Sequence, residues 1–204
     1  MRAFKLIMLL GSWMLMTPLM ANDDPKALIK SASDEMIKQL TVNKEAIKTD
    51  DTKVMAIVEE VLIPLFATNT ISRKVLGVHA RRASDEQQQQ FADAFKDYMI
   101  RFYAKAFAAY DDQVIEYEDA PEFEDKSRVT IKTRLLQNGG QPIPIDYRLQ
   151  RSGDSWKIID VKIEGISLVI SNKSQFGNQI SRDGLDTVIA KLSYKNDQAK
   201  SNES

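Results

Sequence analysis

The sequence predicts a single α+β domain, in which a curved antiparallel sheet of about four strands packs with several helices and encloses an apolar cavity. Up to Tyr110 the apolar residues recur every three or four positions, as on a helix, and beyond it they alternate with polar residues, as on a half-buried strand. No internal repeat and no Pro/Gly-rich linker divides the chain, so one hydrophobic core is expected.

The first 21 residues have the pattern of a secretory signal peptide. Two basic residues precede an apolar run over 6–16, and the small residue Ala21 ends the segment. The run is shorter than a membrane span, although an uncleaved membrane anchor is the alternative. We therefore expect export, one domain over residues 22–194, and a polar, disordered tail over 195–204.

Composition excludes several classes of protein. The chain has no cysteine, so neither disulfides nor thiolate metal sites are available. Its formal net charge is −1, and loss of the signal segment would make it more negative. No whole-molecule basic field therefore attracts nucleic acid.

Capping residues place the first helices. Asp24 and Pro25 provide an N-cap and a proline at the first helical position. A second helix is capped by Asp51 or Thr52 and is kinked or ended at Pro64. A third helix is expected over 71–76, closed by Gly77, and a fourth over 84–110, which begins with a capping box at Ser84. Two more helices are expected towards the C-terminus: one that includes Phe176 and Ile180, and one that begins at Asp183.

The strands follow from alternation and turn residues. We expect strands over 114–117, 129–135, 143–149 and 156–163, joined by turns that include 138–140 and 152–154. In the last strand, strict alternation puts Trp156 and Ile158 on one face, and Ile159, Val161 and Ile163 on the other. Gly165 then permits a turn with positive φ into the next helix.

Catalytic motifs are almost absent. The chain has no P-loop, no dinucleotide-binding glycine pattern, no HExxH and no nucleophile elbow. His79 is the only histidine and fits a helix cap or a surface position better than a base. Asp160, assigned to the face of Trp156 and Ile158, fits a hydrogen bond to a strand or helix terminus better than substrate contact. We expect no catalytic residue, no metal and no cofactor.

The stretch 156–169 carries a family resemblance. It reads Trp-Lys-Ile-Ile-Asp-Val-Lys-Ile-Glu-Gly-Ile-Ser-Leu-Val and is followed by Ser-Gln-Phe at 174–176. This order, with Arg-Lys-Val-Leu-Gly at 73–77, resembles the periplasmic phospholipid-binding component (MlaC) of the maintenance-of-lipid-asymmetry system, also called the toluene-tolerance auxiliary family. The departures are Lys173 for arginine, Ile166 for valine and Ala80 for tryptophan.

The resemblance implies a non-enzymatic periplasmic carrier of diacyl phospholipid. Such carriers exchange lipid between an outer-membrane lipoprotein–porin complex and an inner-membrane ABC transporter that bears a ring of lipid-binding domains. A periplasmic adaptor without lipid is one alternative, and a small cone-fold enzyme using His79 and Asp160 as an acid–base pair is another. Composition alone does not distinguish a lipid cavity from a filled core.

On the carrier hypothesis, the apolar faces of the long helix and the sheet supply the pocket. The expected lining residues are Phe95, Met99, Phe102, Tyr103, Val129, Ile131, Ile145, Tyr147, Val161, Ile163 and Ile166. Gly165 is the expected hinge. Arg81, Arg82 and Lys173 are expected at the head-group rim, where guanidinium and ammonium groups suit phosphate, although a solvated face explains them equally well.

Overall fold

A computed structural model describes residues 24–137 and 139–201, the last five of them as backbone only. The predicted signal peptide over 1–21 lies outside these residues. The helices are α1 (Pro25–Val42), α2 (Lys44–Ile47), α3 (Asp51–Val61), η1 (Ile63–Leu65), α4 (Thr68–Leu76), η2 (Gly77–Arg81), α5 (Asp85–Ala108), α6 (Leu168–Asp183) and α7 (Leu185–Ser201). The strands are β1 (Val114–Tyr117), β2 (Arg128–Leu136), β3 (Ile143–Ser152), β4 (Ser155–Ile163) and β5 (Ile166–Ser167).

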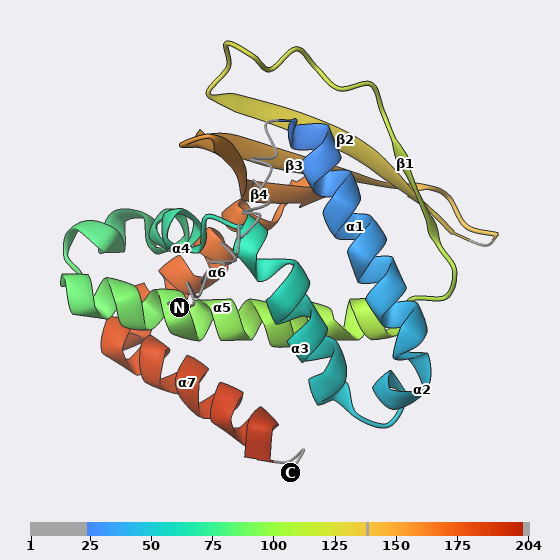
Figure 1. The fold of residues 1–204 in the computed structure, drawn as a ribbon. Helices are drawn as coiled ribbons and strands as arrows, with labels where there is room; N and C mark the ends of the chain where they lie inside the picture. Colours follow the sequence, from blue (N-terminus) through green and yellow to red (C-terminus); the bar gives the residue numbers. More distant parts are fainter. Residues whose placement is uncertain (1–23, 138, 202–204) are drawn as a thin grey trace, which may run out of the picture.

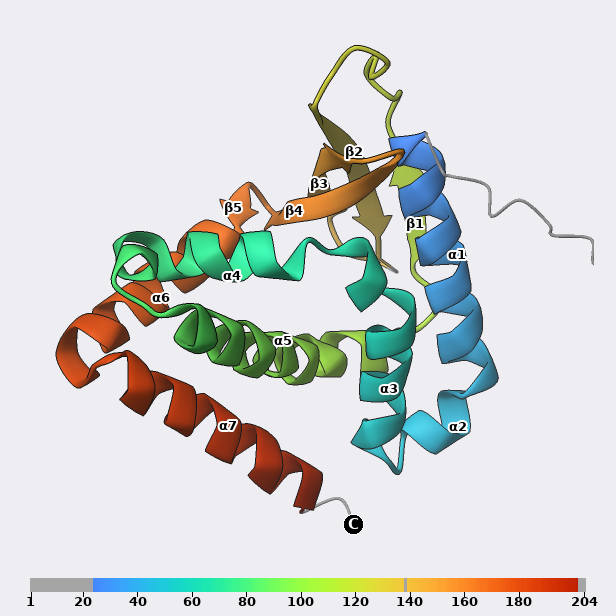
Figure 2. The same ribbon diagram turned by 60° about the vertical axis from the view of Figure 1, so that its left-hand side comes forward.

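The strands form one antiparallel sheet in the order β1-β2-β3-β4-β5. The helices gather on the concave side of this curled sheet, and no helix of the described residues covers its other face (Figures 1 and 2). The predicted α+β class is therefore confirmed. The sheet has five strands rather than about four because the residues after Gly165 pair with the end of β4 before α6 begins. None of the helices in the described ranges is both long and apolar enough to cross a membrane.

Local capping explains where the helices begin. The Asp24 carboxylate accepts hydrogen bonds from the backbone N–H groups of Lys26 and Ala27, as the sequence predicted. Ser84 and Gln87 form the expected capping box of α5. The cap of α3 differs from the prediction: it is Asp50, not Asp51 or Thr52.

A β-bulge in β4 changes the predicted strand faces. Leu149 pairs with Ile158 and Arg148 pairs with Asp160, so Ile159 is an extra residue with no partner across the ladder. The assignment of Ile159 and Val161 to one face was therefore wrong. Val161 and Ile163 share the concave face with Ile158. Asp160 pairs with Arg148, and its carboxylate reaches the start of α6, where it borders the cavity.

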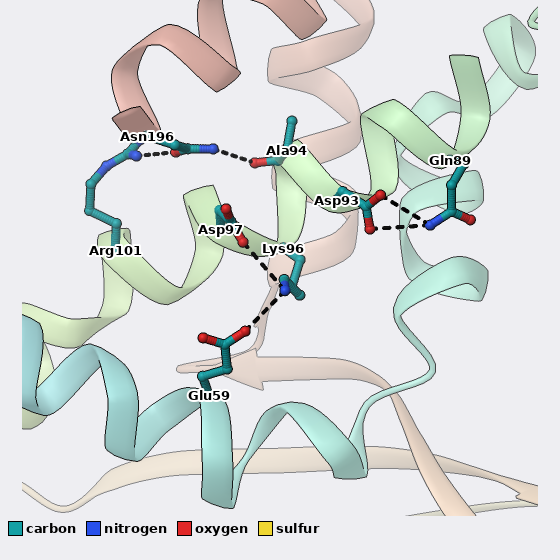
Figure 3. Close-up of polar contacts among 8 residues, drawn as sticks. All are labelled: Glu59, Gln89, Asp93, Ala94, Lys96, Asp97, Arg101 and Asn196. Atoms are coloured by element: carbon teal, nitrogen blue, oxygen red, sulfur yellow. Dashed lines mark hydrogen bonds and ion pairs between the residues drawn. The ribbon is translucent and has the colours of Figure 1, made fainter. Parts of the chain in front are cut away.

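The C-terminal helix also differs from expectation. Asp183 ends α6 instead of beginning the last helix, because Gly184, with φ of 83°, separates α6 from α7. The disordered tail predicted from Lys195 is wrong as far as Ser201, which ends α7. Helix α7 packs along the side of α5 that faces away from the sheet (Figure 2). The buried Asn196 bonds to the Ala94 carbonyl and accepts from Arg101, both on α5 (Figure 3).

Candidate functional site

An apolar cavity of about 650 Å³ lies between the concave face of the sheet and helices α1, α3, α5 and α6. Its wall is formed mainly by aliphatic and aromatic side chains from elements far apart in the sequence. The apolar lining includes Ile29, Met36, Leu40, Val58, Leu62, Phe66, Phe95, Met99, Ile100, Tyr103, Phe107, Ile115, Leu135, Ile143, Ile145, Tyr147, Ile158, Val161, Ile163, Leu168 and Val169.

The sheet wall follows from the strand register. Leu135 pairs with Ile143, Ile145 with Ile163, and Tyr147 with Val161, so these six side chains form three cross-strand pairs on one face. Without the bulge at Ile159, Val161 would point out of the cavity. The local irregularity of β4 therefore helps to keep this wall apolar.

The helical wall comes chiefly from α5. Phe95, Met99 and Tyr103 recur every fourth residue and therefore lie along one stripe of the helix. Burial raises the pKa of the Tyr103 phenol, with a smaller contribution from Tyr98. The wall is consequently uncharged along this stripe over the physiological pH range.

Tyr147 places a phenol in the sheet wall of the cavity. Burial raises its pKa to about 12, with a smaller contribution from Tyr117. Part of its surface remains accessible because the side chain faces the cavity, not bulk solvent. The phenol is therefore held in its neutral form, which suits an apolar ligand.

Lys96 is the one basic residue among the described residues of the cavity wall. Its ammonium lies 3.0 Å from Glu59 of α3 and 3.5 Å from Asp97 of α5 (Figure 3). The Glu59 hydrogen bond is the largest contribution to the raised pKa of Lys96, so the side chain is charged. A cation therefore lies where α3 and α5 meet at the cavity.

The structure brings together seven of the eleven predicted lining residues: Phe95, Met99, Tyr103, Ile145, Tyr147, Val161 and Ile163. The other four lie elsewhere. Val129 and Ile131 are on the concave face, but Ile29 of α1 packs over that end of the sheet and, with Leu149 and Trp156 of the neighbouring strands, fills the space there. Phe102 is 59% exposed and Ile166 is 62% exposed, because the former lies on the outer side of α5 and the latter begins the two-residue edge strand β5.

The residues predicted for the head-group rim do not border the cavity. Arg81 and Arg82 are exposed at the end of η2, and Lys173 is exposed on α6 with its aliphatic chain beside Gly77. Sequence reasoning missed Lys96, which is one of several polar residues on α5. Only the positions of Phe95 and Met99 beside it on the helix could have indicated that it borders the cavity.

The candidate acid–base residues are not brought together by any contact. The imidazole of His79 lies 3.4 Å from the Ser181 hydroxyl, at an exposed position. Asp160 is buried and accepts from the Ser167 hydroxyl and from the Val169 backbone N–H, at the start of α6. The expected hydrogen bond from Asp160 to a helix terminus is thus confirmed. No group of three or more potential metal-ligating side chains occurs within the part of the chain that the structure describes.

Gly165, the predicted hinge, has φ of 81°, and the preceding Glu164 has φ of 52°. Both values lie in the left-handed region, which glycine adopts freely and glutamate does not. The connection between β4 and β5 is therefore a tight turn with backbone strain at Glu164.

This architecture defines the class of α+β domains that enclose an apolar cavity of ligand size between a curled sheet and a layer of helices. A sequence model of the MlaC protein family matches residues 30–194, and the chain belongs to that family.

Known proteins similar to the chain agree with this assignment. The toluene tolerance protein ttg2D of Pseudomonas putida is 28% identical over 89% of this chain and 83% of its own length. The intermembrane phospholipid transport system binding protein MlaC of Haemophilus influenzae is 27% identical, over 84% of this chain and 82% of its own length. A solved phospholipid-binding protein from Ralstonia solanacearum, in complex with a phospholipid, superposes with a TM-score of 0.77 at 30% identity, over 86% of this chain and 98% of that one.

Proposed function

We propose that the protein is a periplasmic phospholipid carrier that holds acyl chains in the cavity between the sheet and α5. The observation that carries the proposal is the continuous apolar wall of a cavity of about 650 Å³. A similar protein from Ralstonia solanacearum has been solved with a phospholipid bound, which supports the same ligand class here.

The energetics favour an enclosed ligand. Two acyl chains contain roughly 30 methylenes, and at ~0.8 kcal/mol each their exposure to water costs on the order of 20 kcal/mol. A carrier must bury most of this surface, whereas the charged head group stays at the edge. Lys96, at the wall, is the cation placed to meet a head-group phosphate if its contact with Glu59 opens.

The partners and the location follow from the same proposal. We infer export to the periplasm through the segment 1–21, and a binding domain that begins at 22 and includes α7. The carrier would exchange diacyl phospholipid with an outer-membrane lipoprotein–porin complex and with an inner-membrane ABC transporter that has a ring of lipid-binding domains. Gly165 is the proposed hinge, because it lies in the turn between the sheet wall and α6.

Neither alternative is favoured by the described residues. An acid–base enzyme would need His79 beside Asp160, but the contacts of these two side chains are with Ser181 and with the start of α6, respectively. An adaptor without lipid would need a filled interior. The cavity argues against such an interior.

Native mass spectrometry of the protein purified from periplasm without detergent tests the proposal. We expect a stoichiometric mass increment that fragments as a diacyl phospholipid, both in the wild type and in His79→Ala. An apo mass that persists after incubation with phospholipid vesicles would overturn the carrier function and favour the adaptor. Loss of function in His79→Ala with normal lipid content would instead favour the enzyme.

A further inference from the structure

The outward face of the sheet carries a concentration of positive charge that the cavity does not explain. On β2, the residues that alternate with the buried Val129, Ile131 and Thr133 are Arg128, Lys132 and Arg134, all exposed. On β3 and β4 the same face adds Arg148 and Lys162, because Arg148 pairs with Thr130 and Lys162 pairs with Asp146. We call Arg128, Lys132, Arg134, Arg148 and Lys162 the outer basic face.

Acidic groups compensate this charge only in part. Arg134 lies 3.6 Å from Glu116, and Arg148 lies 3.8 Å from the buried Asp160. Asp146 is a third acid on this face, where it is the cross-strand partner of both Lys132 and Lys162. Within the described ranges, Arg128, Lys132 and Lys162 form no ion pair within 4 Å. Because the whole chain has a formal net charge of −1, the rest of the molecule must be acidic relative to this face.

The border of the face with α4 is more strongly basic. Lys74 of α4 lies close enough to Arg128, Arg148 and Asp160 to interact with all three electrostatically. Burial lowers the pKa of Lys74, and the charges of Arg128 and Arg148 lower it further. Arg148 and Lys74 therefore share the Asp160 carboxylate, whose oxygens already accept from Ser167 and Val169, and Arg128 adds a third positive charge near Lys74.

We propose that the outer basic face is a docking surface for an anionic lipid bilayer. No helix in the described part of the chain covers this face in either view (Figures 1 and 2), so its cations are available to head-group phosphates. Each Lys or Arg held near an anionic bilayer contributes about 1 kcal/mol of attraction, which salt screens. The acidic remainder of the molecule is repelled by the same surface, and the protein is thereby oriented.

A bilayer fits this face better than a folded protein partner does. Protein interfaces are centred on buried apolar and aromatic side chains. Of the exposed large hydrophobic residues in the described part of the chain, Val114 alone lies on this face, at the β1 end. Fluid head groups, by contrast, can rearrange to meet charges spread over three neighbouring strands.

Vesicle co-sedimentation of the full-length protein tests the proposal. The probes are vesicles of phosphatidylcholine alone and of equal parts phosphatidylcholine and phosphatidylglycerol, each at low and high salt. We expect binding to the anionic vesicles at low salt only. Arg128→Glu/Lys132→Glu should weaken it at least about tenfold, since two attractive charges become repulsive.

Lys53→Glu/Lys105→Glu is the matched control, because it changes the net charge equally at exposed lysines of α3 and α5. It should leave vesicle binding within about twofold of wild type. Equal weakening in both double variants, or no wild-type binding to anionic vesicles, would overturn the proposal. So would a defect of Arg128→Glu/Lys132→Glu in lipid transfer to a partner complex with vesicle binding intact, because the face would then meet a protein. Lipid content by native mass spectrometry reports on the cavity separately.

Discussion

The Ser167 hydroxyl donates a hydrogen bond of 2.7 Å to the Asp160 carboxylate and accepts one of 3.1 Å from the Ile170 backbone N–H. The other Asp160 oxygen accepts from the Val169 N–H at 3.2 Å. Both Asp160 and Ser167 are buried. The residue after the bulge in β4 thus fixes the first turn of α6 against the sheet, and Leu168 and Val169 are held at the cavity wall.

Replacing Asp160 should destabilise the fold substantially. Asp160→Ala leaves the buried Ser167 hydroxyl and the Val169 N–H without their acceptor, so we expect a loss of about 3 kcal/mol in the free energy of unfolding. Ser167→Ala removes the helix cap and should cost about 1 to 2 kcal/mol. Denaturant unfolding measures both, with Asp154→Ala in the exposed β3–β4 turn as the control. An Asp160→Ala loss no larger than that of the control would show that Asp160 does not hold α6.

Replacing Gly165 with alanine should lower the free energy of unfolding, whereas replacing Gly177 with alanine should raise it. Gly165 has φ of 81°, where a side chain is strained even though no atom lies within 4 Å of the added Cβ, so Gly165→Ala should cost about 1 to 2 kcal/mol. Gly177 lies within α6 in equally open space, and Gly177→Ala should stabilise by about 0.5 to 1 kcal/mol. If Gly165 is the hinge, Gly165→Val should also slow lipid loading or release. Unchanged transfer kinetics in Gly165→Val would exclude that role.

Asn196 should make the end of α7 important for stability. Its side chain is 4% exposed and bonds to the Ala94 carbonyl and to Arg101 of α5. Asn196→Ala leaves these buried partners unsatisfied and should lower the free energy of unfolding by about 1 to 3 kcal/mol. The exposed neighbour Lys195→Ala is the control. If both variants unfold alike, the C-terminal turns of α7 do not contribute to the core.

Local signals in the sequence were sufficient for most of the fold. Ser84 with Gln87, Asp24 with Pro25, and Gly77 each specify a terminus through contacts within a few residues, so they could be recognised without a structure. The bulge at Ile159 has no such signal, because it is set by pairing with β3. The tail was misjudged for a similar reason: Asn196 is polar in the sequence, but its partners lie about 100 residues earlier in the chain.

For the cavity residues, too, local sequence patterns were informative and long-range packing was not visible in the sequence. Periodicity placed Phe95 and Met99 on the cavity side of α5 but put the exposed Phe102 with them, and alternation placed Val129 and Ile131 on the concave face. Neither pattern could indicate where along the strands the cavity ends. That depends on α1, which packs over Val129 and Ile131 and leaves the region near Ile145 open.

Filling the cavity should reduce lipid content without unfolding the protein. Met99→Trp adds bulk at the centre of the α5 wall, so we expect a lower bound-lipid fraction in native mass spectrometry and a change in the free energy of unfolding within about 2 kcal/mol. Phe102→Trp, one turn away on the outer side of α5, is the matched control and should retain its lipid. Equal lipid content in both variants would mean that the ligand does not occupy the space beside Met99.

Tyr147 should make the protein sensitive to alkaline pH. Its folded-state pKa of about 12 lies above the ordinary value of 10.0, so between these pH values the folded chain keeps a proton that the unfolded chain releases. The contribution of Tyr147 to the free energy of unfolding is therefore fully present below about pH 10, and roughly 2 to 3 kcal/mol of it is lost as the pH rises to about 12. Denaturant unfolding of Tyr147→Phe at about pH 8 and about pH 11 should show a smaller loss than wild type, because this variant has no phenol to ionise. Tyr194→Phe, at an exposed position on α7, should follow the wild type. If Tyr147→Phe loses as much stability as the wild type between these pH values, the alkaline sensitivity originates in another group.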